Sequence, residues 1–503
     1  MHTIDHFLNK TTMYRVVLYS LCAISLFSIL FGFLGLVSYS GIDLLLSYFA
    51  IAFLCYFANV IFGFIFKVDP NKESPLITAL ILFLILSPLE SLSGIPIFVL
   101  ASVLAIGSKY IFTLHKAHIF NPAAISIFIL GLFGSNAVVW WVATPYLLPM
   151  VIICGFLITR KVNKFGMFFT FFFTGLGTIL IWTFVQKSPI DIMQIFYSWP
   201  IVFLGTFMLT EPFTTPPKYK EQIMYGLIVG ILFGVQFRVG PLYSTPEFAL
   251  IIGNIFSYIL NPKRKITLTL KEKNKLSEDV CQFVFSPGYK LSFDAGQYME
   301  WTLNHKNPDS RGSRRYFTIA SSPTEKNIIL TTKFAKESST FKKELFDLNI
   351  GKTLLSAQIE GDFTLPKDPK QKIVWIAGGI GVTPYRSMAK FISDSGLKRD
   401  VVLLYSARRP KDLVYKNLFD SMKDKIGLKN IYIVNDADGL TLQNDTKVGL
   451  INAELIQKEI LDYKERRFYI SGPEGMVEAF EGMLKGIGVP GDQIQTDFFP
   501  GYM

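Results

Sequence analysis

The pattern of hydrophobic and polar positions divides the chain into two stretches. Up to about residue 260, long apolar runs follow one another with short polar interruptions, whereas the remainder consists of short alternating runs punctuated by Gly and Pro. An apolar run of about 20 residues is long enough to cross a bilayer as a helix. The first stretch therefore predicts a polytopic α-helical transmembrane domain over residues 1–262, and the second predicts soluble domains.

About ten apolar runs make up the first stretch, and some are short enough to be tilted or broken spans. The run that follows Lys10 and Arg15 has no small-residue cleavage site, so we expect a retained first helix. Loops rich in Lys and Arg alternate with poorly charged loops, which predicts a multi-pass protein of the cell membrane with cytoplasmic N- and C-termini. The runs begin near Tyr14, Asp43, Pro75, Gly94, Ile119, Ala137, Phe165, Ile190, Glu221 and Glu247.

The second stretch predicts two domains of different sheet type. Five short alternating runs, at residues 266–270, 280–285, 298–303, 315–320 and 328–334, are typical of a small antiparallel β-barrel over residues 265–366. After residue 370, apolar strands alternate with helices, which predicts a parallel α/β domain over residues 370–503. The strands are expected at 373–377, 401–405, 431–434 and 467–470, and the helices at 385–392 and 412–421.

Composition and charge narrow the class of protein. The 503 residues are 50% hydrophobic and 18% charged, with a net charge of +11. The basic residues lie in short loops without a long basic run, so membrane topology explains the charge better than nucleic-acid binding. No CxxC pair occurs, which argues against a disulfide framework, a zinc site and a cysteine-ligated cluster. His115 and His118 are expected at the level of the lipid headgroups, and no histidine falls in mid-span as a haem ligand would.

Candidate chemistry begins on the fourth strand of the predicted barrel. Arg315 offers a fixed fork of donors that suits a pyrophosphate. Phe317 can lie against an isoalloxazine ring, and Thr318 can place a hydroxyl near the ring nitrogen that accepts hydride. A surface Arg and a core Phe on an ordinary strand are the simpler alternative. Ser338, Ser339 and Thr340 open the next predicted helix. The free backbone N–H groups at its start suit phosphates, although plain N-capping also explains the three hydroxyls.

Glycine-rich turns follow two strands of the predicted α/β domain. Strand 373–377 leads into Gly378-Gly379-Ile380-Gly381-Val382-Thr383-Pro384 and then a helix. Glycines at such a turn let a pyrophosphate approach the backbone at the helix N-terminus. A second turn, Ser471-Gly472-Pro473-Glu474-Gly475-Met476, follows strand 467–470.

In order and spacing, these motifs resemble the ferredoxin–NADP reductase superfamily over about residues 265–503. The resemblance implies FAD and NAD(P)H as cofactors, with Thr318 and Ser471 at the reacting atoms. Ser471 replaces a Cys of many members, so slower hydride transfer is expected. FAD would be bound by Arg315, Tyr316, Phe317, Thr318, Ser338, Ser339 and Thr340. An aromatic at the end of the chain, Phe499 or Tyr502, can cover the flavin until nicotinamide displaces it, and a plain C-terminal core anchor is the competing interpretation. NAD(P)H would be bound by Gly378, Gly379, Gly381, Thr383, Pro384, Gly472, Pro473 and Met476. Ser406 and Arg408 can grip a 2′-phosphate and favour NADPH slightly, but this loop is basic in related proteins of both kinds, so the choice between NADH and NADPH stays open.

Two polar motifs interrupt the apolar stretch, Phe120-Asn121-Pro122-Ala123-Ala124 and Leu209-Thr210-Glu211-Pro212-Phe213-Thr214-Thr215. A capped helix and a proline-rich loop explain each of them alone. Together they resemble the B subunit of the sodium-pumping NADH:quinone oxidoreductase and the D subunit of the Rnf complex, over residues 14–260. The resemblance implies a membrane redox site with Asn121, Thr144, Thr210, Glu211 and Thr214.

The resemblance has a departure at the point where such subunits often attach FMN covalently. Their Ser-Gly-Ala-Thr motif is replaced here by Trp141-Val142-Ala143-Thr144. Noncovalent FMN or riboflavin, or a quinone against Trp140 and Trp141, is the alternative to covalent attachment at Thr144. An interfacial aromatic belt is the simpler interpretation of the two tryptophans.

The combined hypothesis is a membrane-bound flavoprotein oxidoreductase. Cytosolic NAD(P)H reduces FAD, and electrons continue to a membrane flavin, a quinone or an extracytoplasmic acceptor. Two alternatives come from other classes: a membrane-anchored flavin reductase that serves a soluble partner, and a redox-driven ion or flavin transporter. The sequence leaves the terminal acceptor and the oligomeric state open.

Overall fold

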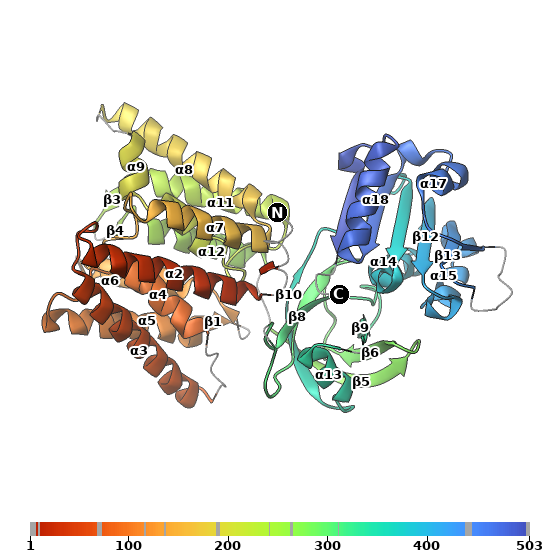
Figure 1. Ribbon diagram of the computed structural model, residues 1–503, viewed down its shortest axis with the longest axis horizontal. Coiled ribbons are helices and arrows are strands. Elements are labelled where there is room, and N and C mark those ends of the chain that lie inside the picture. Colours follow the sequence, from red (N-terminus) through yellow and green to blue (C-terminus); the bar gives the residue numbers. More distant parts are fainter. Residues whose placement is uncertain are drawn as a thin grey trace. The chain divides into compact units, whose positions relative to one another are not determined.

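The chain separates into two units, Met1–Arg264 and Lys265–Met503. The computed structural model describes residues 7–8, 11–67, 73–114, 117–134, 137–187, 192–240, 242–261, 265–309, 311–335, 337–437 and 445–498. The first unit is built from helices, and the second holds both large sheets (Figure 1).

Helices of the N-terminal unit begin close to most of the predicted apolar runs, but the run at Ala137 becomes helical only from Leu148. Four described segments are long and apolar enough to cross a membrane: Met13–Phe33, Gly41–Ile65, Leu92–Ile111 and Phe165–Val185. Three more are apolar but shorter, so the structure does not support a count of ten full-length spans. The helices are α2 (Met13–Phe33), α3 (Gly41–Ile65), α4 (Ser74–Ile85), α5 (Ile95–Ile111), α6 (Pro122–Leu132), α7 (Leu148–Val162), α8 (Phe165–Val185), α9 (Ile192–Ser198), α10 (Ile201–Phe203), α11 (Tyr219–Gly234) and α12 (Pro246–Leu260).

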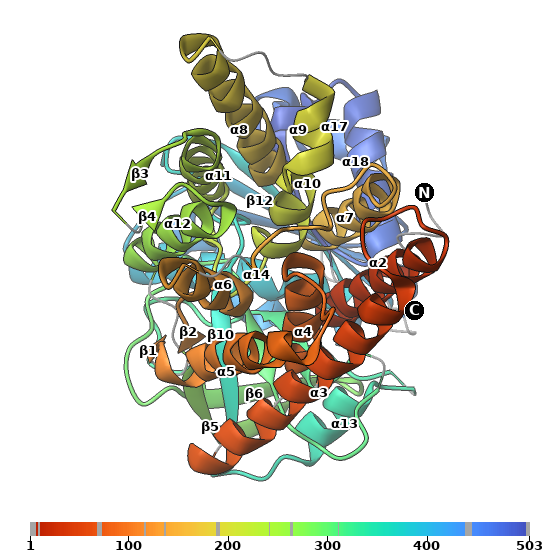
Figure 2. The ribbon, with the colours of Figure 1, turned by 90° about the vertical axis from the view of Figure 1, so that its left-hand side faces the viewer.

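Helices α8 and α11 pack unusually closely, and Figure 2 shows them side by side. A Cβ atom added to Gly226 of α11 would lie 2.6 Å from the carbonyl oxygen of Met167, and one on Gly234 would lie 2.8 Å from that of Gly175. With Gly230 between them, glycines at every fourth residue of α11 let the two backbones approach, as in many membrane helix pairs.

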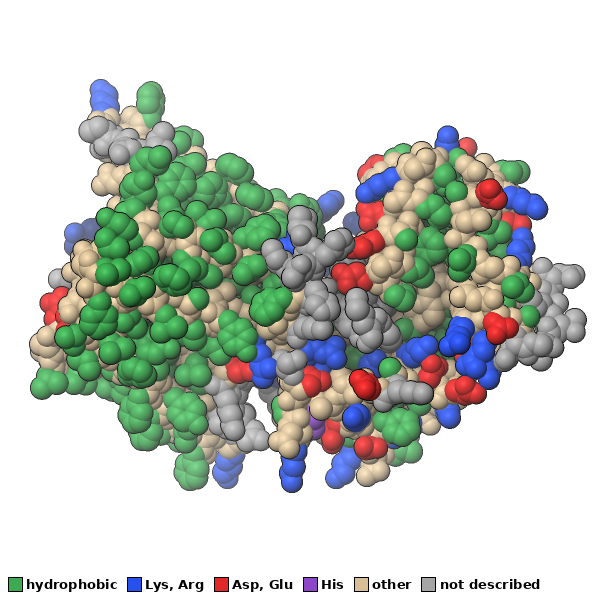
Figure 3. Space-filling model, viewed as in Figure 1, with side chains coloured by type: hydrophobic (Ala, Val, Ile, Leu, Met, Phe, Trp, Pro, Cys, Tyr) green, Lys and Arg blue, Asp and Glu red, His purple; other side chains and the backbone are tan. Residues whose placement is uncertain are grey.

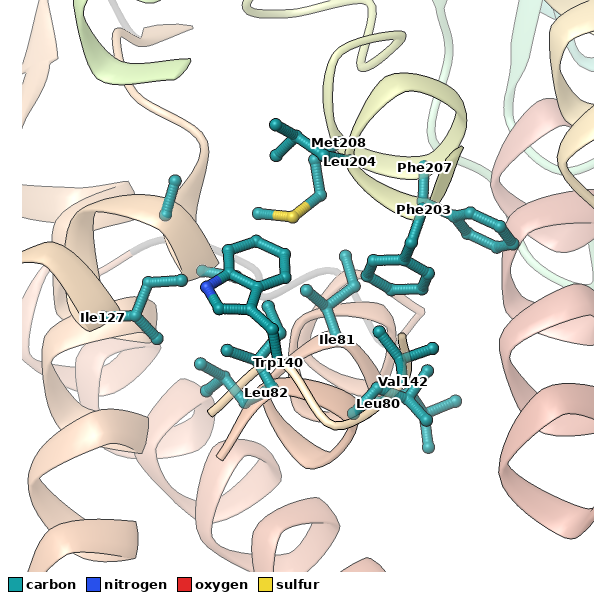
Figure 4. Close-up of a cluster of buried hydrophobic side chains, with 14 of the residues drawn as sticks. Leu80, Ile81, Leu82, Ile127, Trp140, Val142, Phe203, Leu204, Phe207 and Met208 are labelled. Atoms are coloured by element: carbon teal, nitrogen blue, oxygen red, sulfur yellow. The ribbon is translucent and has the colours of Figure 1, made fainter. Parts of the chain in front are cut away.

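Trp140 and Trp141 belong to the core of this unit, with 7% and 6% of their surfaces exposed. The Trp141 indole donates hydrogen bonds to the carbonyl oxygens of Phe83 (2.8 Å) and Leu86 (3.0 Å). Figure 4 shows Trp140 among buried side chains of several helices. The expectation of an interfacial aromatic belt is therefore wrong, because both indoles find their partners inside the protein.

Apolar side chains are also abundant on the outside of the N-terminal unit, as the green surface in Figure 3 shows. Helix α8 contributes Phe173 and Phe184, which are 63% and 85% exposed. An apolar surface of this extent is typical of contact with a membrane or with another protein.

The first sheet of the C-terminal unit is antiparallel, with strand order β8-β7-β10-β5-β6-β9. Five of its strands match the predicted ones and β10 was not predicted. A hydrogen bond from Ala320 N to Ile329 O (2.9 Å) connects the segment after β8 to β9, but closure into a barrel stays a prediction. The strands are β5 (Ile266–Lys275), β6 (Val280–Ser286), β7 (Tyr298–Thr302), β8 (Arg314–Thr318), β9 (Ile328–Lys333) and β10 (Thr353–Glu360), and helix α13 spans Thr340–Asp347.

The second sheet is parallel, with strand order β14-β13-β12-β11-β15-β16, as the alternation of strands and helices predicts. Successive residues of β11 face opposite sides: Trp375 packs with residues of α14, and Ile376 packs with residues of α17 and α18. Both faces are thus covered by helices. The elements are β11 (Ile373–Gly378), α14 (Thr383–Asp394), β12 (Val401–Ala407), α15 (Lys416–Asp420), α16 (Lys423–Ile426), β13 (Leu428–Val434), β14 (Thr446–Val448), α17 (Ala453–Glu459), β15 (Arg467–Gly472), α18 (Glu474–Gly486) and β16 (Ile494–Phe498).

The helix predicted at 412–421 is present only as α15. Tyr415 precedes it in the left-handed region, with φ of 65°. Few residues other than Gly adopt that conformation, so the helix cannot extend back through this position.

Candidate flavin and nucleotide site

Arg315, the second residue of β8, directs its guanidinium at the segment that precedes the strand. Its Nη1 donates to the carbonyl oxygens of Arg311 (2.8 Å), Gly312 (2.9 Å) and Arg314 (2.7 Å). Its Nη2 donates to both carboxylate oxygens of Asp309, at 2.7 and 2.9 Å. The guanidinium is therefore held in one orientation, and the Asp309 carboxylate occupies donors of Arg315 that also suit a phosphate.

The N-terminus of α13 completes this anion site. The backbone N–H of Thr340 donates to Asp309 Oδ2 (3.2 Å), and the Ser339 hydroxyl caps the helix by accepting from Lys342 N (3.3 Å). Burial lowers the pKa of Lys342 to about 8, and the nearby arginines act in the same direction. An excess of buried positive charge at a helix N-terminus fits the pyrophosphate of FAD. Ser338 is half-buried and donates to Ala335 O (2.8 Å), so its hydroxyl is already used.

Phe317 and Tyr316 lie on opposite faces of β8. The Phe317 ring packs against Phe341 of α13, with ring centroids 5.8 Å apart. Tyr316 is half exposed, and its hydroxyl donates to Glu300 (3.2 Å). Phe317 thus lies with the anion site, whereas Tyr316 faces the other side of the sheet.

The hydroxyls of Thr318 and Ser471 are among the buried hydroxyls that have no hydrogen-bond partner within the described part of the chain. Such groups are rare in proteins and indicate a missing partner. Ser321, shortly after Thr318, accepts a hydrogen bond from Ser387 of α14 through its carbonyl oxygen (2.6 Å). Tyr385, also on α14, donates to the carbonyl oxygen of Tyr469 (2.9 Å), two residues before Ser471. One helix turn therefore bonds to both segments that carry the unpaired hydroxyls, which fits a flavin–nicotinamide junction.

The glycine turns have the tight geometry that the sequence predicts. Gly379 has φ of 51°, and a Cβ on Gly381 would collide with the carbonyl oxygen of Ser471. Met476 packs where side chains on Gly378 and Gly472 would stand. Met476 therefore holds the two turns together, and the contacts do not assign it to a cofactor. Thr383 and Pro384 open α14, with the Thr383 hydroxyl donating to Ile380 O (3.2 Å), and Pro473 is the N-cap residue of α18.

The end of β12 lies beside the first glycine turn, because Ser406 is paired in register with Gly378. Arg408 is exposed, whereas Arg409 forms ion pairs with Asp412 (3.2 Å) and Glu278 (3.3 Å). Contact of Ser406 and Arg408 with the adenosine ribose or its 2′-phosphate stays a prediction. Phe499 and Tyr502 lie outside the described residues.

Acidic residues that sequence reasoning missed lie near the end of β16. Asp497 is paired in register with Ser471. Burial raises the pKa of Asp497 to about 7, and the charge of Asp362 acts in the same direction. Neither residue belongs to a recognisable motif; strand register brings Asp497 beside Ser471, and the loop after β10 carries Asp362.

The polar motifs of the N-terminal unit converge on Glu211. Its carboxylate accepts from Asn121 Nδ2 (2.8 Å) and Thr214 Oγ1 (3.4 Å) and lies 3.2 Å from His118 Nε2. Asn121 also caps α6, as predicted, and its backbone N–H donates to Asn254 Oδ1 (2.8 Å). His118, expected at headgroup level, is instead half-buried and paired with Glu211. His115 lies outside the described residues.

Among the described residues, no hydrogen bond connects Thr144 or Thr210 to this network. Thr144 Oγ1 accepts from Leu147 N (3.4 Å), and Thr210 Oγ1 donates to Thr206 O (2.6 Å). Both hydroxyls are thus satisfied by nearby backbone. Within the described residues, no group of three or more His, Cys, Asp or Glu side chains could hold a metal ion.

Comparison with known proteins relates part of the chain to flavin-dependent reductases. Residues 375–482 match the oxidoreductase NAD-binding domain family. The stachydrine N-demethylase reductase subunit of Rhizobium meliloti is 29% identical over 214 residues, which are 42% of this chain and 60% of the relative. The glycine betaine monooxygenase reductase subunit of Pseudomonas aeruginosa is 28% identical over 213 residues, 42% of this chain and 57% of the relative. The chain thus spans about 60% of the length of these relatives.

Solved structures with similar folds cover about half of the chain. The cytochrome P450 reductase GcoB of Amycolatopsis has 22% identity and a TM-score of 0.43, covering 48% of this chain and 72% of that one. The FAD/NAD-binding domain of a Vibrio cholerae nitric oxide dioxygenase has 20% identity and a TM-score of 0.41, covering 46% and 98%.

The family match and the reductase relatives indicate the class of the C-terminal unit. It contains an oxidoreductase NAD-binding domain and is similar to reductase subunits, which supports an NAD(P)H-dependent FAD oxidoreductase. The matched residues 375–482 include both glycine turns.

Proposed function

We propose that the whole chain is a membrane-bound flavoprotein oxidoreductase that passes electrons from NAD(P)H through FAD to an acceptor in its N-terminal unit. The observation that carries the proposal is the pair of unpaired buried hydroxyls, Thr318 and Ser471, beside the glycine turns. When bound, FAD accepts hydride from NAD(P)H and releases electrons one at a time.

The residues of the C-terminal unit have distinct roles in this proposal. Arg315 and the N-terminus of α13 bind the pyrophosphate of FAD, and the Phe317 ring lies against the isoalloxazine ring. Thr318 donates its hydroxyl to the flavin ring, and Ser471 orients the nicotinamide. The backbone around Gly379 and Gly381, with Thr383 and Pro384 at the start of α14, holds the nicotinamide nucleotide's phosphates.

The acceptor belongs to the N-terminal unit in this proposal, at the network around Glu211. Lys164, which precedes α8, donates to Thr215 beside this network, and Lys109 lies in the last turn of α5. The positive-inside rule then predicts that the network faces the cytoplasm. Support comes from the convergence of Asn121, Glu211 and Thr214, which lie 90 and 3 residues apart in sequence. The acceptor would be FMN, riboflavin or a quinone, as the resemblance to the two membrane subunits implies, and from it electrons would reach an extracytoplasmic acceptor.

Counting flavins on the purified full-length chain tests the proposal. Extraction before and after protein precipitation is expected to release FAD, together with FMN or riboflavin if the N-terminal unit carries a second flavin. Flavin that stays with the precipitate would indicate covalent attachment at Thr144. A chain with no flavin absorbance would refute the proposal.

The alternative is that the N-terminal unit is only an anchor for a reductase that serves a soluble partner. The reductase-subunit names of the relatives favour this alternative. Replacing Glu211 by Gln separates the two. The anchor alternative predicts unchanged transfer to every native acceptor, whereas the proposal predicts loss of transfer to membrane acceptors with unchanged reduction of FAD.

A further inference from the structure

The two sheets of the C-terminal unit are joined by a buried ion pair that no sequence motif indicates. Arg386 of α14 is 7% exposed, and its guanidinium donates to both carboxylate oxygens of Glu325, in the loop between β8 and β9. The same guanidinium donates to Ala320 O (3.1 Å). Both terminal nitrogens of the buried guanidinium are thus paired with the first sheet's segment, and because a buried Arg is costly without such partners, these bonds hold α14 to the first sheet.

Tyr415, between β12 and α15, connects the two sheets through separate hydrogen bonds. The Tyr415 hydroxyl lies 2.6 Å from Thr331 Oγ1 of β9 and donates to Gln282 Oε1 of β6 (2.8 Å). Tyr415 has φ of 65°, and the Arg386 guanidinium lies 5.8 Å from the centre of its ring. An unfavourable backbone conformation persists only where the surroundings hold it in place, and it indicates a constraint at this position.

These contacts lie next to the proposed reacting groups. Arg386 bonds Ala320, two residues beyond Thr318. The preceding residue of α14, Tyr385, bonds the carbonyl oxygen of Tyr469, two residues before Ser471. Any rotation of one sheet against the other would therefore change the separation of the two hydroxyl-bearing segments and stretch the Arg386 contacts.

We infer that Arg386, Glu325 and Tyr415 form a positioning device that fixes the distance between the nicotinamide and the flavin. The inference rests on the proposed function of this site. Hydride transfer requires reacting atoms about 3–3.5 Å apart, and a misplacement of about 1 Å can slow a reaction by about a hundredfold. The device controls the chemical step without contacting either cofactor.

Single-turnover reduction of the flavin in the full-length chain tests the inference. Arg386→Lys and Glu325→Gln are each expected to slow flavin reduction by NAD(P)H at least tenfold, while flavin content and KM change less than twofold. The charge-exchanged double variant, Arg386→Glu with Glu325→Arg, is expected to recover part of the rate. Unchanged rates in both single variants would overturn the inference.

A matched control separates positioning from stability. Arg466 is also 7% exposed and ion-paired, with Asp400 (2.7 Å) and Asp462 (2.6 Å), but all three lie in segments that directly precede β12 and β15 of the second sheet. Arg466→Lys is expected to lower the melting temperature as Arg386→Lys does, yet to leave the rate of flavin reduction within twofold. An equal loss of rate in the control would overturn the inference.

A distance measurement tests the device without any flavin. Spin labels on cysteines introduced at Lys352 and Lys458, both exposed, report on the first and second sheet. Tyr415→Phe and Arg386→Lys are expected to broaden the distribution of label distances, and an unchanged distribution would contradict the device. If the wild-type chain binds no flavin, the proposed function fails while this measurement still decides the coupling of the sheets.

Discussion

Replacing Asp309 by Asn is expected to tighten FAD binding about ten- to a hundredfold. The carboxylate occupies the Arg315 fork at 2.7 and 2.9 Å and accepts from Thr340 N at 3.2 Å, which are the donors expected to hold the pyrophosphate. FAD must displace it to use them. A hydrogen bond to a charged group contributes about 1.5–3 kcal/mol net. Asn lacks the charge that competes with phosphate, and each 1.4 kcal/mol changes a Kd about tenfold.

The assay is FAD titration of flavin-free protein, followed by quenching of flavin fluorescence. Asp279→Asn is the control, because Asp279 forms an ion pair with Lys333 (2.9 Å) in the same unit but away from Arg315. Although burial acts in the opposite direction, Arg315 holds the pKa of Asp309 below its ordinary value. The ion pair therefore stabilises the flavin-free protein above the unfolded-state pKa and is lost as pH falls through the folded-state pKa. An unchanged or weaker affinity in Asp309→Asn would show that the carboxylate orients Arg315 and does not compete with FAD.

Three further predictions concern the nucleotide side of the site. Burial and Asp362 raise the pKa of Asp497 to about 7, so the folded state holds a proton that the unfolded state loses near pH 4, and stability should fall as pH rises from about 4 to 7. Urea unfolding of Asp497→Asn should show a smaller dependence across that range. Gly381→Ala should lower the free energy of unfolding by about 1–3 kcal/mol and raise KM for NAD(P)H, because its Cβ meets the Ser471 carbonyl oxygen. Arg408→Ala should raise KM for NADPH about tenfold and leave KM for NADH within twofold, since a charge-assisted bond to the 2′-phosphate contributes about 1.5–3 kcal/mol; equal effects on both would contradict that role.

The parts of the site that depend on local backbone chemistry were predictable from the sequence. Glycines between a strand and a helix predict a tight turn, and the structure has that turn at Gly378 to Thr383. The alternation around Arg315 predicts β8 to within two residues at either end. These elements depend on near neighbours along the chain, so a single sequence contains the information that specifies them.

Long-range partners limit the prediction for the N-terminal unit. Trp140 and Trp141 have the composition of an interfacial belt, but their indoles bond Glu247 (3.3 Å) and the carbonyl oxygens at the end of α4. His118 and Glu211 are 93 residues apart, and their pairing follows only from the folding of α6 against the 204–215 segment. Apolar runs predict where helices occur. The number of complete spans depends on helix length, and breaks within the apolar runs determine that length.

The same distinction separates the two kinds of residue at the flavin–nicotinamide junction. Thr318 and Ser471 belong to sequence motifs: Thr318 ends the Arg-Tyr-Phe-Thr stretch of β8, and Ser471 begins the second glycine turn. Arg386 and Glu325 are 61 residues apart, and neither turn chemistry nor periodicity requires an Arg or a Glu at those positions. Motifs therefore indicate which groups react, while the contacts that set the separation of two sheets appear only in the folded chain. Mutations in the motifs should change cofactor binding. Mutations of Arg386 or Glu325 should change the rate of flavin reduction while cofactor binding stays constant.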